Sequence, residues 1–64
     1  MTDLTPRQTM LLHLLAKGMD DRGIAFVMQI EERTLRGLVT TLLEKCGLHS
    51  RSQCAEYLRQ KDES

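Results

Sequence analysis

The sequence predicts an all-α domain of four short helices, with a tri-helical helix-turn-helix core and a fourth helix at the C-terminus. Three observations support this fold class: helix start signals at Thr5, Asp20 and Ser50, glycines that end helices at Gly18 and Gly47, and leucine-rich stripes at helical spacing between them. The 64 residues form one domain, 1–64, which we expect to be ordered over about 4–59, with a charged tail at 60–64. A domain of this size buries only about 60% of its unfolded surface, so we expect modest stability.

The first helix has a complete start signal. Thr5 is the N-cap, Pro6 takes the first helical position, and Gln8 stands three residues after the cap, where it closes a capping box. We expect this helix to run to about Lys17 and to end at Gly18. Its buried stripe is formed by Leu11, Leu12, Leu14 and Leu15.

The second helix is predicted to begin at Asp20, whose carboxylate caps the positive end of the helix dipole. It continues through Ile24, Ala25, Val27 and Met28 to a turn at Gln29-Ile30. The third helix then runs from Glu32 to about Cys46, after a weak cap at Glu31, and stops at Gly47. Its apolar positions recur at helical spacing: Leu35, Leu38, Val39, Leu42 and Leu43.

Ser50 and Gln53 form a second capping box, which opens the fourth helix. The apolar residues of this helix are Cys54, Ala55, Tyr57 and Leu58.

Composition narrows the class of protein. Nine basic and nine acidic residues give a formal net charge of zero, but the stretch with Arg33, Arg36, Lys45 and Arg51 contains only Glu44 as an acid, which leaves room for a small basic face. The chain has no signal peptide and no membrane-spanning apolar run, so we expect a cytoplasmic protein with free thiols.

Neither catalysis nor metal binding is expected. His13 and His49 have no nucleophile at a suitable spacing, and no pair of carboxylates shares one face, so an enzyme is disfavoured. Cys46, His49 and Cys54 match no zinc signature, and we expect both cysteines to act as small buried hydrophobes. No cofactor is expected.

Residues spread over about nine-tenths of the chain form a pattern that aligns without insertions or deletions. This set resembles the DNA-binding domain of the LuxR/GerE family of bacterial transcription regulators. The resemblance implies a cytoplasmic regulator that binds double-stranded DNA with the helix 32–46 in the major groove and forms a homodimer through the fourth helix. The set comprises Leu4-Thr5-Pro6-Arg7, Gly18, Ile24-Ala25, Ile30, Glu32-Arg33-Thr34, Leu43-Glu44-Lys45, Gly47 and Ser50-Arg51-Ser52-Gln53.

The resemblance also implies roles for individual residues. The positions that contact base edges hold Arg36, Gly37 and Thr40. The residues expected to contact phosphates are Arg22, Arg33, Thr34, Lys45 and Arg51, although Arg51 could instead form a structural ion pair. Dimer contacts fall on Cys54, Tyr57 and Leu58.

Several positions depart from the family pattern. Phe26 and Val27 stand where relatives are commonly basic or polar, and Gly37 offers no side chain to a base. Phe26 either folds back over the small core or belongs to a surface that receives a protein. The alternative function is therefore a degenerate helix-turn-helix protein that binds another transcription regulator and inhibits or modulates it. Further departures are Gln8 for Glu, Leu38 for His, Thr41 for a basic residue and Gln29 for Gly.

The sensory half that most family members carry does not occur in this chain. The chain is either complete or an excised fragment.

Overall fold

The computed structural model describes the backbone of residues 3–63 and the side chains of residues 3–61. It has four α-helices and no strand within the described residues, which confirms the predicted all-α class. Helix α4 continues to Glu63, past residue 59, where the sequence suggests that a charged tail begins, and Ser64 lies outside the described residues. The helices are α1 (Pro6–Ala16), α2 (Asp21–Met28), α3 (Glu32–Cys46) and α4 (Cys54–Glu63), with a 3-10 turn, η1, over Arg51–Gln53.

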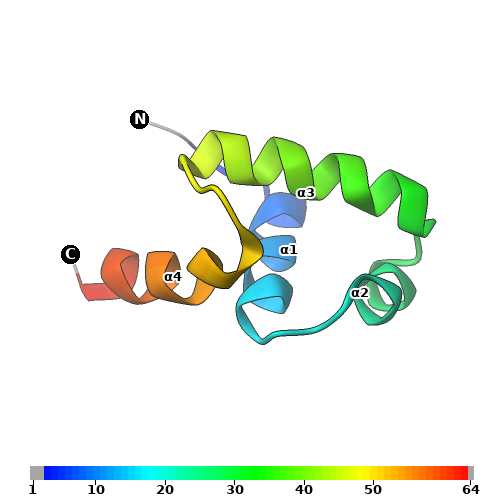
Figure 1. The fold of residues 1–64 in the computed structure, drawn as a ribbon, viewed down its shortest axis with the longest axis horizontal. Coiled ribbons are helices and arrows are strands. Elements are labelled where there is room, and N and C mark those ends of the chain that lie inside the picture. The colour runs from blue at the N-terminus through cyan, green and yellow to red at the C-terminus, as the bar shows by residue number, and fades with distance from the viewer. Residues whose placement is uncertain (1–2, 64) are drawn as a thin grey trace.

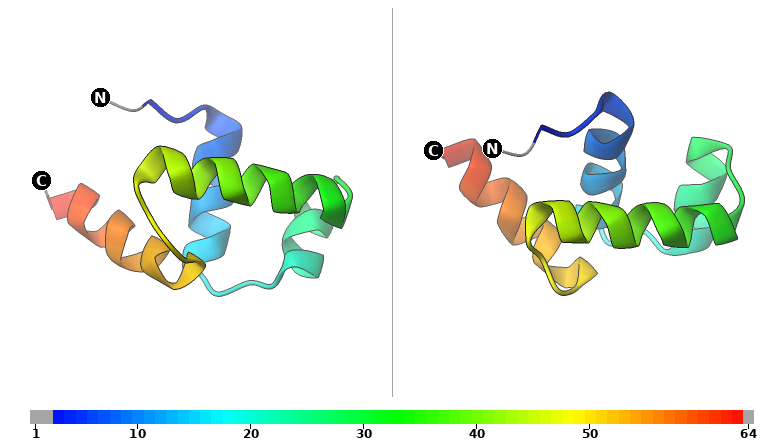
Figure 2. Two further views of the ribbon diagram at one scale, coloured as in Figure 1. Left: turned by 45° about the horizontal axis from the view of Figure 1, so that its top comes forward. Right: turned by 90° about the horizontal axis from the view of Figure 1, so that it is seen from above.

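The long helix α3 lies along one side of the molecule, and α1 crosses behind it (Figures 1 and 2). The shorter α2 packs near the start of α3, whereas α4 lies at the opposite end of the molecule and packs against α1. This arrangement leaves α3 covered on one side only, so its other side faces solvent along its length.

Local capping interactions fix the helix boundaries where the sequence predicts them. The Thr5 hydroxyl accepts a hydrogen bond from the Gln8 amide at 3.1 Å, and the Gln8 side chain accepts one from the Thr5 amide at 3.0 Å. Asp20 caps α2 by accepting from the Gly23 amide at 2.9 Å. Glu31 makes no side-chain cap bond, as its weak capping propensity predicts.

The turn between α2 and α3 begins at Gln29, which stands where the family pattern often has Gly. Gln29 has φ 58° and ψ 46°, and it is the only non-glycine residue with a positive φ among the described residues. A left-handed conformation costs a residue with a Cβ about 1–2 kcal/mol, whereas glycine adopts it freely. Gln29 therefore closes α2 at an energetic cost that a glycine would avoid.

We expect Gln29→Gly to raise the free energy of unfolding by about 0.5–1 kcal/mol, because the relief of left-handed strain exceeds the extra unfolded-state entropy of glycine. Chemical denaturation followed by circular dichroism measures the change. Gln60→Gly is the matched control, since Gln60 lies within right-handed helix α4 and the same substitution there should lower stability. Equal losses from both variants would show that the Gln29 backbone is unstrained.

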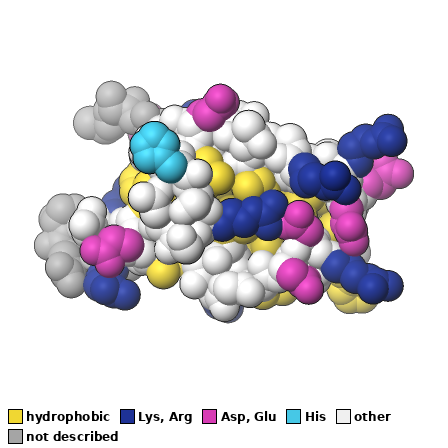
Figure 3. Space-filling view, viewed as in Figure 1, with side chains coloured by type: hydrophobic (Ala, Val, Ile, Leu, Met, Phe, Trp, Pro, Cys, Tyr) yellow, Lys and Arg dark blue, Asp and Glu magenta, His cyan; other side chains and the backbone are white. Residues whose placement is uncertain are grey.

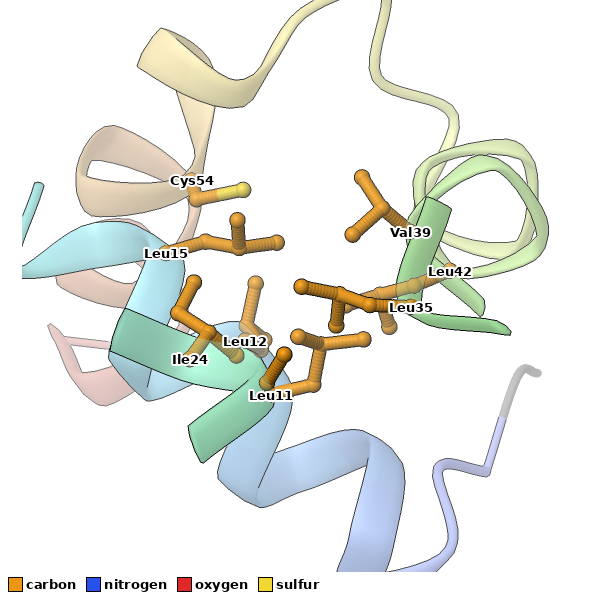
Figure 4. Packing of buried hydrophobic residues seen from close by; sticks show 9 residues of the cluster. Leu11, Leu12, Leu15, Ile24, Leu35, Val39, Leu42 and Cys54 are labelled. Atoms are coloured by element: carbon orange, nitrogen blue, oxygen red, sulfur yellow. The ribbon is translucent and has the colours of Figure 1, made fainter. Parts of the chain in front are cut away.

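The core lies where α1, α2, α3 and the start of α4 meet (Figure 4). Leu14, expected in the buried stripe of α1, is half-buried at the edge of this core. Cys54 is fully buried, and its sulfur points into the cluster. Burial raises the pKa of the Cys54 thiol, which keeps it neutral. The buried residues are Leu11, Leu12, Leu15, Ile24, Ala25, Leu35, Val39, Leu42 and Cys54.

Candidate nucleic-acid interface

The solvent-facing side of α3 is the candidate interface. Leu35, Val39 and Leu42 turn one side of this helix into the core. Because side chains repeat about every 100° around a helix, the residues between them project outward. The three base-reading candidates of the sequence, Arg36, Gly37 and Thr40, are all exposed on that outer side.

Arg36 and Thr40 differ in how much of their hydrogen-bonding capacity is used within the protein. Arg36 forms no ion pair with a described residue, so its guanidinium is available to an external acceptor. The Thr40 hydroxyl donates to the Arg36 carbonyl oxygen at 3.1 Å, one turn back along α3. This bond uses the Thr40 proton inside the helix and leaves the methyl group as the free part of the side chain.

Three of the phosphate candidates flank this helix face. Arg22 on α2 and Arg33 and Thr34 at the start of α3 are exposed, and neither arginine forms an ion pair with a described residue. Figure 3 shows Lys and Arg side chains gathered over α2 and the first part of α3, with Asp and Glu side chains between them. The positive charge of this region is therefore local, and the neighbouring carboxylates partly neutralise it.

Arg51 is held in an ion pair inside the protein. Its guanidinium contacts both carboxylate oxygens of Asp21, one through Nη1 and the other through Nη2 at 3.1 Å. This hydrogen bond lowers the pKa of Asp21, partial burial opposes the shift, and the nearby charge of Arg36 lowers that pKa slightly further. Arg51 thus forms a structural ion pair, which is one of the two roles that the sequence allows for it. This ion pair holds η1 against the start of α2.

Lys45 is also engaged within the protein and faces away from Arg36. Its ammonium donates to the Asp3 carbonyl oxygen at 3.0 Å and to the Gln8 side chain at 3.1 Å. Nine residues separate Lys45 from Arg36, which places the two on sides of α3 about 180° apart. Lys45 therefore does not belong to the same face as the base-reading candidates.

The three dimer candidates all lie on the side of α4 that faces its own domain. Cys54 is fully buried, so the expectation that it contacts a second copy is wrong: the sulfur fills the monomer core. Tyr57 and Leu58 are half-buried against that core, and Leu58 lines a groove with Leu12 and His13 of α1. Lys61 lies over the Tyr57 ring, 5.7 Å from its centroid.

Phe26 and Val27 form an exposed apolar patch on α2. Phe26 is 85% exposed and Val27 44% exposed, so neither covers the core. Met10 on α1 is also 44% exposed, which the sequence did not single out. Of the two alternatives for Phe26, the one in which it folds back over the core is contradicted, because Ile24 and Ala25 already fill the buried side of α2.

Two other features do not occur among the described residues. No group of three or more His, Cys, Asp or Glu side chains comes close enough there to hold a metal ion. Within the same part of the chain, no helix has the length and apolar character needed to cross a bilayer.

A short helix, a three-residue turn and a longer helix with an exposed, partly basic side define a helix-turn-helix DNA-binding domain. Residues 2–58 match the family described as bacterial regulatory proteins, luxR family, and the chain belongs to that family. No solved structure matches the chain significantly.

Three curated relatives are similar to this chain. Transcriptional regulatory protein YdfI of Bacillus subtilis is 33% identical over 94% of the chain, and the match covers 28% of that relative. The bialaphos biosynthetic pathway regulatory protein of Streptomyces hygroscopicus is 43% identical over 80% of the chain and 20% of the relative. The DNA-binding transcriptional activator DevR/DosR of Mycobacterium tuberculosis is 35% identical over 89% of the chain and 26% of the relative. The chain thus spans less than a third of the length of these relatives.

Proposed function

We propose that this protein is a bacterial, cytoplasmic transcription regulator that binds double-stranded DNA through α3 in the major groove. The observation that carries the proposal is the guanidinium of Arg36, which is exposed in the first half of α3 and forms no ion pair with a described residue, in a domain of the LuxR family. A guanidinium can donate two hydrogen bonds to O6 and N7 of guanine, which gives base specificity.

Contacts beside α3 supply the orientation on DNA. Arg22 near the start of α2 and Arg33 near the start of α3 would contact phosphates, and Thr34 offers a hydroxyl beside Arg33. Arg51 and Lys45 contribute less than the family resemblance implies, because Asp21 and Gln8 already bind them. Each domain therefore neutralises few phosphates, in keeping with its zero net charge.

A gel-shift titration against random duplex DNA at 50 and 200 mM salt tests the proposal. Two or three neutralised phosphates per bound domain predict an affinity loss of about 10-fold to 40-fold between these salt concentrations. No detectable binding at the lower salt concentration would contradict DNA binding.

We further propose that a second copy pairs through α4, since a core of this size benefits from additional burial. The contact would use the outer side of this helix, where Ala55 is exposed, together with the half-exposed edges of Tyr57 and Leu58. Substitution of Leu58 is a poor test, because this residue also packs against the core of its own domain.

We expect Ala55→Glu to shift the protein from dimer to monomer while leaving the helices formed, because a buried like-charge pair at a two-fold axis opposes association. Analytical ultracentrifugation over a range up to hundreds of micromolar measures the change. Thr41→Glu is the control, since it places the same charge on an exposed position of α3. A parent protein that remains monomeric throughout would contradict the α4 dimer.

A second function is favoured by the apolar patch of Phe26 and Val27. A phenylalanine that is 85% exposed serves no packing role in the domain, and contiguous exposed apolar surface marks sites of protein binding. In this alternative, the patch docks another transcription regulator and the protein inhibits or modulates that partner.

We expect Phe26→Arg to change the free energy of unfolding by no more than about 0.5 kcal/mol, because the side chain is exposed. If the patch docks a regulator, the variant loses that partner in a pull-down while it keeps DNA affinity. Thermal melts, pull-downs and DNA titrations of parent and variant measure the three properties. Stability and all binding left unchanged would remove the support for this second function.

A further inference from the structure

A small apolar pocket lies where the first half of α1, the end of α2 and the middle of α3 come together. Its volume is about 150 Å³. The fully buried Leu11 and the half-buried Met28 and Leu38 form its apolar lining, whereas its polar residues come from the N-cap and first turn of α1. We call this cavity the Leu38 pocket, and its lining residues are Thr5, Arg7, Gln8, Leu11, Met28 and Leu38.

Two departures from the family pattern meet in the Leu38 pocket. Gln8 stands where the pattern has Glu, and Leu38 stands where it frequently has His. Both residues line this one cavity, although they lie on different helices. A carboxylate and an imidazole are thus replaced by a neutral amide and a hydrocarbon side chain. The apolar character of the pocket is therefore a property of this chain and does not come from the family pattern.

The rim of the Leu38 pocket is basic. Arg7 is exposed and forms no ion pair with a described residue. Lys45 donates to the Gln8 side-chain oxygen at 3.1 Å and to the Asp3 carbonyl oxygen at 3.0 Å, and both acceptors are neutral. An ammonium group has three protons, so Lys45 keeps one donor for a further acceptor. Because Gln8 lacks the charge of Glu, it leaves the positive charge of Lys45 without a carboxylate at this position.

The volume of the Leu38 pocket suits a single apolar side chain. An apolar cavity of about 150 Å³ holds a benzene ring. Sites for drug-sized molecules are larger, at about 300–1,000 Å³. A phenylalanine ring therefore fills the pocket, whereas a larger metabolite does not fit. The basic rim complements carboxylates, and the Arg7 guanidinium can donate two parallel hydrogen bonds to one of them.

We propose that the Leu38 pocket is a docking site for an acidic segment of a partner protein, which inserts one phenylalanine ring into the pocket and places a carboxylate on Arg7. Lys45, about two turns further along the same side of α3, attracts a second carboxylate. Neither Phe26 nor Val27 lines the pocket, so this surface is distinct from the apolar patch on α2. The inference does not depend on DNA binding, because none of the base-reading candidates lines the pocket either.

Titration of isotope-labelled protein with the blocked pentapeptide Glu-Glu-Phe-Glu-Glu tests the proposal by NMR. We expect saturable shifts of the amide signals of Arg7, Gln8, Met28 and Leu38, with a dissociation constant of about 1 mM for one buried ring and exposed charges. Replacement of the peptide's Phe by Ala should weaken binding at least about tenfold. The peptide Lys-Lys-Phe-Lys-Lys should not bind, because its charge repels the rim.

Variants of the protein separate the ring contact from the charge contact. Arg7→Gln should keep the fold and weaken peptide binding about threefold at low salt. Lys17→Gln is the matched control, since it removes the same charge at the opposite end of α1 and should leave the affinity nearly unchanged. Leu38→His puts a polar ring into the pocket and should abolish the shifts. Phe26→Ala, which alters only the patch on α2, should bind the peptide as the parent does.

Several results would overturn the proposal. One is the absence of saturable shifts at several times the expected dissociation constant, and another is equal binding of the Phe and Ala peptides. Shifts centred on Phe26 and Val27 would place the peptide on the other surface. If duplex DNA shifts the amides of Arg7 and Gln8 and the peptide does not, the basic rim contacts phosphates instead. Should Leu38→His fail to fold, Arg7→Gln decides the matter, because unchanged affinity there contradicts the charge contact.

Discussion

Replacement of Leu35 by alanine is expected to lower the free energy of unfolding by about 2–5 kcal/mol. Leu35 is fully buried on the inner side of α3, in the same cluster as Leu11 and Ile24, so its truncation leaves a cavity among α1, α2 and α3. Small domains have total stabilities at the lower end of about 5–15 kcal/mol. The loss is therefore large enough to populate the unfolded state measurably.

Urea denaturation followed by circular dichroism measures this effect. Thr41→Ala is the matched control, because it truncates an exposed residue of the same helix and should change stability by no more than about 0.5 kcal/mol. A Leu35→Ala variant within about 1 kcal/mol of the parent would show that α3 is not anchored to the core at this position.

The helix boundaries could be predicted because their signals are local. The capping box of Thr5 and Gln8 involves residues three apart, so the sequence contains both partners of each hydrogen bond. In such cases, short-range chemistry determines the backbone, and the tertiary structure does not override it. Gln29 stands where the family pattern often has Gly, but its left-handed conformation is seen only in the structure.

The sequence does not show whether the apolar side of α4 packs against its own domain or against a second copy. Helical spacing indicates that an apolar stripe is covered, but it does not identify the surface that covers it. Cys54, Tyr57 and Leu58 form one stripe in either case. In the structure, Cys54 packs into the domain's own core, and the other two lie half-buried beside it. An intermolecular contact and an intramolecular one thus have the same sequence pattern.

The partners of the charged residues required the fold itself. Asp21 and Arg51 are thirty residues apart and no periodicity links them, so the sequence allows an ion pair for Arg51 but does not identify the acid. The exposure of Phe26 also depends on the fold. Large aromatic residues are usually buried, but two neighbouring apolar residues, Ile24 and Ala25, already occupy the inner side of α2.

Among substitutions on the outer side of α3, Arg36→Ala is expected to have the largest effect on DNA affinity. Loss of a bidentate contact to guanine should cost about 1–3 kcal/mol on the preferred sequence and relax selectivity at that one base pair. Arg36 is exposed and forms no ion pair with a described residue, so its removal leaves no partner unpaired in the free domain. The fold should therefore be unaffected.

Competition binding against duplexes that differ at single base pairs measures the loss of selectivity. Arg22→Ala is the control, since a phosphate contact carries no sequence information: it should weaken all duplexes alike and reduce the salt slope by about one. Equal, sequence-independent losses from both variants would mean that Arg36 also contacts the backbone. Because Asp21 and Gln8 already bind Arg51 and Lys45, little basic charge is left to compensate, and the loss at Arg36 should be a large share of the specific binding energy.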